Sequence, residues 1–474
     1  MITFKIACRN ILRNRRRSLM TMSAIAVGAT AMLLFGAFMA FLVLGFQTTT
    51  VATGGHLSVF RTGYFDYGAG NPAAYGIANY DSVKKLITDD PVLGPLVRVA
   101  TPRVTLFGIA GNFAVDASKT FMGVGVVPSD REQMADWNDY HLTGHHSDRL
   151  PSALRDDDET LGVIGLGLGR ILGLCQALAI PDCPPPPESA ATDTAPATPD
   201  AAPDVAVDIS ELARRDREPV PARSTSPWPR IDLLAATAGG APNVVSLSVA
   251  QAESQRIKEL DDNYVGMHLA LAQQLLYGRG EHKVTVLVLQ LYHTDDMTGA
   301  RNRLLALFKE HHLDLEIRDF TELTPQYHQV LGLFGSIFVF IAVIMSVIVL
   351  FTVVNTMSMS VMERTNEIGT LRAMGVRRRG IRRQFLMEGL LLGLVGASAG
   401  VLLSLIIAAI INQSGVTWMP PGQVTPTPLL LLMSGVPKLI VGTWLGLIVI
   451  AALGALVPAN RAARMPVVDA LRHV

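Results

Sequence analysis

The sequence has few charged residues, few aromatic residues and very little cysteine. Charged residues make up 17% of its 474 residues and aromatic residues 6%, and the three cysteines are Cys8, Cys175 and Cys183. Three cysteines are too few for a disulfide scaffold. The formal net charge is zero, so charge gives no reason to expect nucleic acid as a partner. No lysine follows a glycine, so the phosphate-binding loop of ATPases is absent and we expect that this chain does not hydrolyse ATP itself.

Motifs for other chemistry are also missing. The glycines of GLGLG at residues 165–169 lack the third glycine of a dinucleotide fingerprint, because position 170 is Arg170, so they predict a turn from strand to helix. His141, His145 and His146 lie near two aspartates and could bind a metal ion. No second cluster has ligand spacing, however, so a solvated loop is favoured. The sequence also shows no Ser/His/Asp or Cys/His pattern and no pair of carboxylates that would indicate catalysis. We therefore predict neither a metal site nor an enzyme.

Long apolar runs are what the sequence has in excess. Hydrophobic residues make up 49% of the chain, and a helix needs about 20 of them to cross the hydrocarbon of a bilayer. The first run is longer than the core of a signal peptide, which has roughly 7 to 15 residues, so we expect a retained membrane helix. The predicted transmembrane helices are residues 19–46, 330–362, 385–411 and 439–457.

The distribution of arginine predicts the topology. Arginines gather in residues 1–18, predicted to form an amphipathic helix on the inner leaflet, in the linker 363–384 and in the tail 458–474. The loop 412–438 has one lysine and no arginine. The positive-inside rule places the arginine-rich segments in the cytoplasm. Residues 47–329 and the loop then lie on the other side, which is the periplasm if the protein is in a bacterial inner (plasma) membrane.

The predicted fold is therefore an α-helical membrane protein with four transmembrane helices and a large mixed α/β extracytoplasmic domain between the first and second spans. Strand-like stretches near residues 56–60, 103–109 and 121–127 support the α/β domain. Residues 181–230 are rich in proline and small polar residues and predict a disordered insert. Cys175 and Cys183 are eight residues apart, in the compartment where disulfides persist. A disulfide at the base of the insert and two free thiols both remain open.

Glycines are spaced by four in the third predicted span. Gly389 and Gly393 form one pair, and Gly396 and Gly400 form a second. Small residues at this spacing let membrane helices approach one another closely. We therefore predict helix packing at these four positions, with ordinary glycine enrichment of membrane helices as the alternative.

The linker between the second and third spans contains a candidate partner-binding helix. Ile368, Leu371 and Met374 recur at the spacing of a short amphipathic helix, and Gly375 is suited to end it. Such a helix could dock into a groove on a soluble partner. The alternative is an arginine-rich loop that only fixes the topology.

The run EIGTLRAMG at residues 367–375 resembles the coupling segment of the FtsX-like, MacB-type permeases of ABC transporters. The stretches 162–173, 252–277 and 458–474 resemble the same family, whereas the proline-rich insert departs from it. Within the family, the chain is most similar to the lipoprotein-releasing permeases LolC and LolE, because it lacks the ATPase that MacB carries on the same chain.

This resemblance implies a permease that works with a separately encoded ABC ATPase. ATP and Mg²⁺ would bind to that ATPase, so no cofactor is expected on this chain. The other implied partners are membrane lipid, a second copy of the permease or a paralogue, and a periplasmic carrier or adaptor. The residues implied to contact or couple to the ATPase are Glu363, Arg364, Glu367, Ile368, Gly369, Leu371, Arg372, Met374 and Gly375.

The function implied by the resemblance is ATP-driven release of lipoproteins or lipids from the inner membrane, by motion passed to the periplasmic domain. Two alternatives remain. The first is efflux of small molecules or peptides, as in MacB, and the second is regulation of an extracellular hydrolase without transport, as in FtsX.

Overall fold

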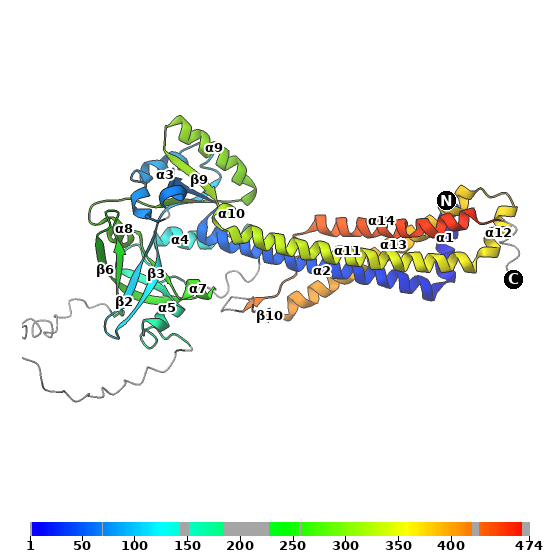
Figure 1. Cartoon of the computed structure of the whole chain (residues 1–474), viewed down its shortest axis with the longest axis horizontal. Coiled ribbons are helices and arrows are strands. Elements are labelled where there is room, and N and C mark those ends of the chain that lie inside the picture. Colours follow the sequence, from blue (N-terminus) through cyan, green and yellow to red (C-terminus); the bar gives the residue numbers. More distant parts are fainter. Residues whose placement is uncertain are drawn as a thin grey trace, which may run out of the picture.

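The computed structural model describes residues 2–68, 70–142, 151–181, 183, 227–255, 257–419 and 426–466. It consists of a long helical bundle and, at one end of the bundle, a mixed α/β unit that we call the head domain (residues 55–324; Figure 1). Most of the predicted proline-rich insert lies outside the described residues, as do His145, His146 and residues 467–474.

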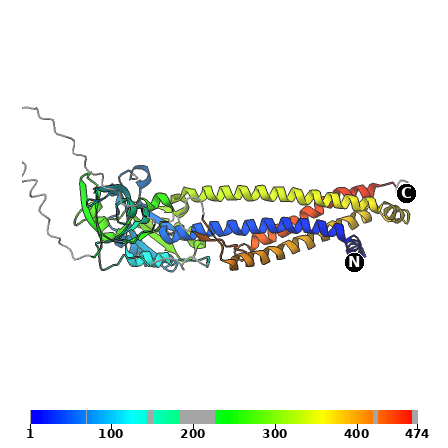
Figure 2. The same cartoon turned by 90° about the horizontal axis from the view of Figure 1, so that it is seen from below.

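Four long helices form the bundle: α2 (Arg15–Gly54), α11 (Pro325–Glu363), α13 (Arg378–Ser414) and α14 (Pro437–Arg464). All four are long and apolar enough to cross a membrane. Each is longer than its apolar run, because polar residues continue the helix at its ends. α2 and α11 have 40 and 39 residues and are about 60 Å long, twice the hydrocarbon thickness. Both reach the head domain (Figure 2).

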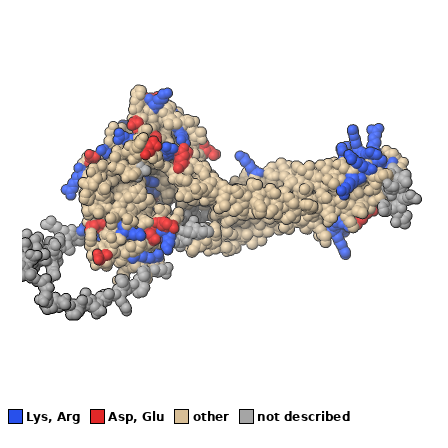
Figure 3. Space-filling model, viewed as in Figure 1, with Lys and Arg blue, Asp and Glu red and all other residues tan. Residues whose placement is uncertain are grey.

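The distribution of charge on the surface agrees with a bundle that crosses a membrane. On the face shown in Figure 3, charged side chains gather on the head domain and at the far end of the bundle. The surface between these two regions is nearly free of charge. An uncharged band of this kind fits the hydrocarbon of a bilayer, where ionised side chains are costly.

Helix α13 packs against two neighbours through its four spaced glycines. Each glycine lies against a small or branched residue of a neighbouring helix. Gly389 and Gly393 meet Ala455 and Ala451 of α14, and Gly396 and Gly400 meet Ile25 and Ala29 of α2. A Cβ atom at any of the four positions would overlap these neighbours. The first pair therefore sets the approach of α14, and the second pair sets the approach of α2.

The head domain contains a closed barrel of six strands. The ring runs β2 (Val97–Asn112), β3 (Ala117–Val126), β7 (Tyr264–His268), β4 (Leu161–Gly165), β6 (Pro242–Glu253), β5 (Arg230–Ala236) and back to β2. The pairs β3–β7 and β4–β6 are parallel, and the others are antiparallel. Leu106, Phe121, Leu233 and Leu247 belong to its buried core, together with residues of α8 (Leu269–Tyr277). Closure leaves the barrel without unpaired edges.

Strand β2 also belongs to a second, smaller lobe. Its first half pairs with β8 (Val286–Leu291), which is followed by β1 (Leu57–Arg61) and β9 (Leu315–Asp319), all antiparallel. Helices α3 (Tyr80–Thr88) and α9 (Met297–Glu310) pack on these strands around a core of their own. Because β1 follows α2 and β9 precedes α11, both long helices enter the head domain through this lobe.

Strand β4 leads directly into α5 (Leu166–Ile171), as the glycine-rich stretch predicts. The buried carboxylate of Asp261 accepts hydrogen bonds from the backbone N–H groups of Leu166 and Gly167 at this turn. Cys175 and Cys183, a few residues further on, form a disulfide with an S–S distance of 1.97 Å. The disulfide joins the segment after α5 to the first residues of the insert.

Two short helices, α1 (Ile2–Arg13) and α12 (Thr365–Ala373), lie at the end of the bundle that is far from the head domain (Figure 1). The remaining elements are short: η1 (Tyr64–Gly68), η2 (Pro72–Tyr75), α4 (Pro128–Ala135), α7 (Lys258–Asp261), η3 (Thr294–Asp296), α10 (Phe320–Leu323), β10 (Thr417–Trp418) and β11 (Thr427–Pro428).

Candidate functional site

The predicted coupling residues lie at the end of the bundle far from the head domain, which we call the arginine-rich end. Here α12 connects α11 to α13, and α1 turns away from the start of α2 (Figure 2). Arg364 lies between α11 and α12 with a backbone conformation outside the helical range (φ −109°, ψ 16°). Gly375 has a φ of +92°, a conformation that glycine adopts readily and that commonly ends a helix. These two residues define α12 as a separate helix.

The apolar face of α12 differs from its prediction. We expected Ile368, Leu371 and Met374 to enter a groove on a partner together. Ile368 is instead 3% exposed and packs into the core of the bundle, with Leu371 partly buried beside it. Met374 is 69% exposed. Ile368 is therefore unavailable to a partner, because burying it in this chain's own bundle already removes it from water. The residues of α12 and its C-cap that lie open are Asn366, Glu367, Thr370, Ala373 and Met374.

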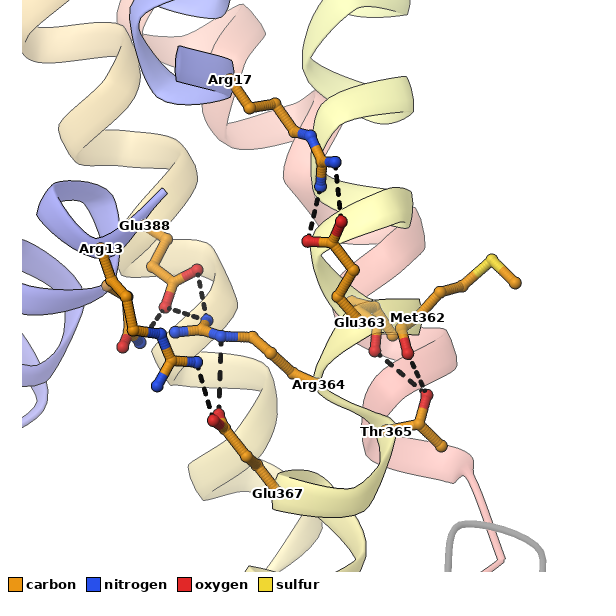
Figure 4. A network of polar contacts seen from close by, with 10 residues as sticks. Arg13, Arg17, Met362, Glu363, Arg364, Thr365, Glu367 and Glu388 are labelled. Carbon is orange, nitrogen blue, oxygen red and sulfur yellow. Dashed lines mark hydrogen bonds and ion pairs between the residues drawn. The ribbon is translucent and has the colours of Figure 1, made fainter. Parts of the chain in front are cut away.

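A buried ion pair holds the start of α12 against α13. Nη1 of Arg364 lies 3.0 Å from Oε1 of Glu388, and the two side chains are 4% and 5% exposed. Asn10 of α1 donates a hydrogen bond to the same Glu388 oxygen at 2.5 Å. Three helical segments thus meet at one carboxylate (Figure 4). In surroundings of low dielectric constant, an unpaired carboxylate at this position would be strongly unfavourable.

Two exposed ion pairs flank the buried one. Arg13 of α1 lies 2.7 Å from Glu367 of α12, and Arg17 of α2 makes two hydrogen bonds of 2.7 Å to Glu363 of α11. Figure 4 shows the three pairs side by side. Nε of Arg364 also lies 3.6 Å from Glu367, which links the buried pair to the first exposed one. The network ties α1 and α2 to α11, α12 and α13.

The other end of α12 is held by a backbone contact. Arg372 donates a hydrogen bond of 2.7 Å to the carbonyl oxygen of Ala463, near the end of α14. Both ends of α12 are thus attached to the bundle. A force applied to its open face would therefore reach α13 through Arg364 and Glu388, and α14 through Arg372.

A small polar cavity lies beside the buried pair. It has a volume of about 20 Å³, enough for one water molecule. Its polar lining comes from four helices: Asn10 of α1, Asn14, Arg17 and Ser18 at the start of α2, Thr356 and Ser360 of α11, and Glu388 of α13. Such a polar pocket lets the four helices meet here without a tight apolar contact.

The sequence prediction missed four residues of this network: Asn10, Arg13, Arg17 and Glu388. Glu388 offered a usable signal, because a carboxylate so close to an apolar run is rare unless it has a partner. The other three offered none, since nothing in the spacing of residues 10–17 indicates that they contact residues more than 340 positions away.

A second set of contacts fixes α2 to the head domain. Gln290 of β8 is fully buried, and its side-chain amide donates to the carbonyl oxygens of Val51 and Met134 at 3.1 and 2.9 Å. Arg103 of β2 donates to the carbonyl oxygen of Thr53 at 2.5 Å. The last carbonyls of a helix lack partners within the helix and attract positive charge. Gln290 and Arg103 supply both needs, so the end of α2 is attached to the sheet.

His56 completes this joint, directly after α2. Its Nδ1 accepts a hydrogen bond from the N–H of Leu291 at 3.0 Å, and its Nε2 lies 3.2 Å from the hydroxyl of Thr294. The rings of Trp137 and Phe320 lie edge-on around it. Burial lowers the pKa of His56 from 6.5 to about 4, although the charge of Asp139 acts in the opposite direction. The ring is therefore neutral, with its proton on Nε2.

No three His, Cys, Asp or Glu side chains lie close enough to hold a metal ion among the residues that the structure describes. Of the three histidines that the sequence analysis considered as metal ligands, the structure describes one. His141 belongs to the described residues, whereas His145 and His146 do not. What the described sites can do is mechanical: they connect helices at the two ends of one long bundle.

Comparison with known proteins finds a family resemblance in part of the bundle. Residues 339–467 match the family model of the FtsX-like permease C-terminal domain. Three curated relatives are each named macrolide export ATP-binding/permease protein MacB. The protein of Hyphomonas neptunium is 31% identical over 194 residues, which is 40% of this chain and 28% of that protein. The protein of Escherichia coli K12 is 37% identical over 131 residues, 28% of this chain and 18% of that protein.

The protein of Bordetella avium is 49% identical over 74 residues, 16% of this chain and 11% of that protein. The chain therefore spans less than a third of the length of these curated relatives.

Proposed function

We propose that this chain, an FtsX/MacB-type ABC transporter permease by its residues 339–467 and its relatives, passes ATP-driven motion from a partner ATPase to its head domain. The observation that carries the proposal is the buried pair of Arg364 and Glu388, which joins α12 to the bundle. A coupling helix must not move independently of the helices it drives, and this pair prevents that. The matching family describes a permease, which supports a non-catalytic role beside a separate ATPase.

The open face of α12 is the proposed contact with the ATPase. Glu367 is 53% exposed and Met374 is 69% exposed, whereas Ile368 is buried. ATP and Mg²⁺ would bind to the ATPase, and this chain would carry no cofactor. In this arrangement Glu363, Arg364, Gly369, Leu371, Arg372 and Gly375 position the helix, whereas Glu367 and Met374 touch the partner.

Motion would reach the head domain through α2 and α11. Both helices run without interruption from the arginine-rich end into the smaller lobe. At its head end α2 is attached by Gln290 and Arg103, so a tilt of the helix would turn the sheet with it. Glu388 is the one Asp, Glu, Lys, Arg or His within the apolar runs 19–46, 330–362, 385–411 and 439–457, and this lack of ionisable residues favours motion of the head domain over passage through the helices.

The proposed setting is the bacterial inner membrane, with the head domain in the periplasm and the arginine-rich end in the cytoplasm. The excess of arginine at one end supports this orientation. The working unit would contain a second copy of the permease or a paralogue, and a periplasmic carrier or adaptor could receive the cargo.

We propose a lipoprotein or lipid as the cargo, taken from the outer leaflet of the inner membrane. A head domain that moves outside the bilayer acts most simply on material already there. Export of macrolides or related small molecules is the second candidate, favoured by the names of the relatives. Reconstitution of the complex in vesicles that contain a fluorescent lipoprotein, or a macrolide, would separate the two by which one leaves the membrane fraction.

The coupling proposal is tested by affinity purification of the tagged chain from its native cells. Glu367→Arg and Met374→Asp should each lose the co-purifying ABC ATPase, or retain it with hydrolysis that no longer responds to the permease. Glu310→Arg is the matched control, because Glu310 is 54% exposed and also forms an ion pair with an arginine, but lies in the head domain. Wild-type amounts of ATPase and wild-type stimulation in both α12 variants would refute the proposal.

A further inference from the structure

The first turns of α13 carry an exposed basic surface that the coupling proposal does not use. We call it the arginine face; it consists of Arg378, Arg379, Arg382 and Arg383. All four side chains are exposed, and basic side chains gather at this end of the bundle (Figure 3). Four cations within two helical turns repel one another, so the surface needs negative charge from some source.

This chain does not supply that charge within its described residues. Three carboxylates lie in the described part of the arginine-rich end, and each is paired elsewhere: Glu363 with Arg17, Glu367 with Arg13, and Glu388 with Arg364. No ion pair of the described residues includes any arginine of the arginine face. Among the described residues the arginine face therefore lacks a counter-charge, which an anionic molecule could supply.

The position of the arginine face on α13 shows where that molecule lies. Ile381 and Phe385 are buried in the bundle. Arg379 and Arg383 are each two residues from Ile381. Two residues are roughly half a turn of a helix, so both arginines lie on the side opposite the buried one. Continuing by seven residues from Arg383 along the same side leads to Leu390, which is 37% exposed and lies within the third apolar run.

Seven residues correspond to about 10 Å along a helix. Arg383 thus lies about 10 Å along the helix from an exposed leucine, which would put it near the headgroups if the apolar run spans a bilayer.

We propose that the arginine face binds the headgroups of anionic phospholipids in the leaflet that surrounds the arginine-rich end. A guanidinium group donates two parallel hydrogen bonds to phosphate oxygens, and each basic residue near an anionic surface strengthens binding about fivefold. Helix α1 would extend the surface, because Ile6 and Leu12 are 39% and 61% exposed beside the exposed Arg9. Exposed apolar and basic residues on one short helix are typical of an interfacial helix. The inference rests on the chain spanning a bilayer and does not depend on coupling to an ATPase.

The test uses the full-length chain in a neutral detergent, titrated with fluorescently labelled phosphatidylglycerol or phosphatidylcholine. The variant Arg379→Gln/Arg382→Gln/Arg383→Gln should bind phosphatidylglycerol about a hundredfold more weakly, as three independent fivefold losses predict. Glutamine has nearly the helix propensity of arginine, so the helix should persist, which circular dichroism checks. Replacing the same three residues with lysine should preserve most of the affinity, because lysine keeps the charge.

Arg61→Gln/Arg155→Gln/Arg279→Gln is the matched control, since it removes three exposed arginines from the head domain. It should leave phosphatidylglycerol binding unchanged. Equal binding of phosphatidylglycerol by the α13 variant and the wild type would overturn the proposal, and so would equally tight binding of phosphatidylcholine by the wild type. If the α13 variant kept its lipid affinity but lost a co-purifying protein, the arginine face would be a protein-binding surface instead.

Discussion

The carboxylate of Glu388 lies in a helix that is otherwise apolar at that depth, and its burial decides the strength of its contacts. Its ion pair with Arg364 and its hydrogen bond from Asn10 are shielded from water. Removing one partner of a buried pair leaves an uncompensated charge, whereas exposed pairs contribute little. The three ion pairs of the network are therefore unequal, although their distances are similar.

Glu388→Gln should lower the free energy of unfolding by about 3 to 5 kcal/mol, because Arg364 stays buried without a counter-charge. Glu363→Gln breaks a half-exposed pair and should change the stability by less than about 1 kcal/mol. Thermal unfolding of the purified protein in detergent, followed by circular dichroism, measures both. The double variant Arg364→Met/Glu388→Leu should recover much of the loss, since neither charge remains. A variant Glu388→Gln as stable as the wild type would show that the pair is not buried in solution.

His56 makes the joint between α2 and the head domain sensitive to acid. Its pKa is about 4 in the folded state against 6.5 when unfolded, so the unfolded chain binds the proton more readily. The stabilisation by the neutral ring is complete above pH 6.5 and is lost as the pH falls toward 4, by about 3 kcal/mol in total. Thermal unfolding at pH 7 and pH 5 should show about 2 kcal/mol of this loss, because pH 5 is still above the folded pKa.

The matched variants for His56 are His56→Asn and His282→Asn. Asparagine at position 56 keeps an acceptor for the N–H of Leu291 but does not titrate, so the unfolding temperature of His56→Asn should depend less on pH between 7 and 5. His282 is exposed, and its replacement should leave the pH dependence as it is in the wild type. An identical pH dependence in His56→Asn and the wild type would contradict the role given to His56.

At the scale of elements, local spacing predicts what a helix can do and not which neighbour it meets. The glycine spacing in α13 pointed to close packing, yet which pair meets α2 and which meets α14 depends on the whole bundle. The periodicity of α12 likewise gave an apolar face, but Ile368 belongs to a buried cluster whose other members lie on α2, α11, α13 and α14. An amphipathic pattern cannot distinguish burial against the same chain from burial against a partner.

Among contacts between elements, the attachment of α2 to β8 should matter most for passing motion to the head domain. Gln290→Leu removes two hydrogen bonds, and the carbonyl oxygens of Val51 and Met134 keep only their backbone donors, the N–H groups of Gly55 and Trp137. We expect a loss of about 2 kcal/mol in local stability. Hydrogen exchange followed by mass spectrometry should show faster exchange in the last two turns of α2, while peptides at the arginine-rich end stay unchanged.

Gln273→Leu is the control for this experiment, because Gln273 is 5% exposed and donates one hydrogen bond to the backbone within the head domain. Its effect should stay near α8 and the carbonyl of Lys283. If exchange in the last turns of α2 were as slow in Gln290→Leu as in the wild type, Gln290 would not hold the joint.

At the scale of the whole molecule, the sequence separates the membrane part from the α/β part because apolar runs are long and unambiguous. Several strands and helices of the head domain also follow from local pattern, such as the helix near residues 296–312 and the strand near 121–127. The closed barrel does not. It depends on β5, which follows the insert, pairing with both β2 and β6, and on two parallel pairs formed by distant segments. Such pairings are set by tertiary contacts, which leave little trace in a local pattern.

Single cysteines in a Cys8→Ser background test the orientation of the whole chain. Ser82 is exposed on α3 of the head domain, and Val376 is 36% exposed next to α12. In intact cells with a permeable outer membrane, Ser82→Cys should react with a thiol reagent that cannot cross the inner membrane, and Val376→Cys should react only after the cells are broken. The reason is the distribution of arginine, since every described arginine of the linker and the tail lies at the same end of the bundle, away from the head domain. Labelling of Val376→Cys in intact cells would place the arginine-rich end outside, where no ATP-driven partner could reach α12, and the coupling proposal would fail with it.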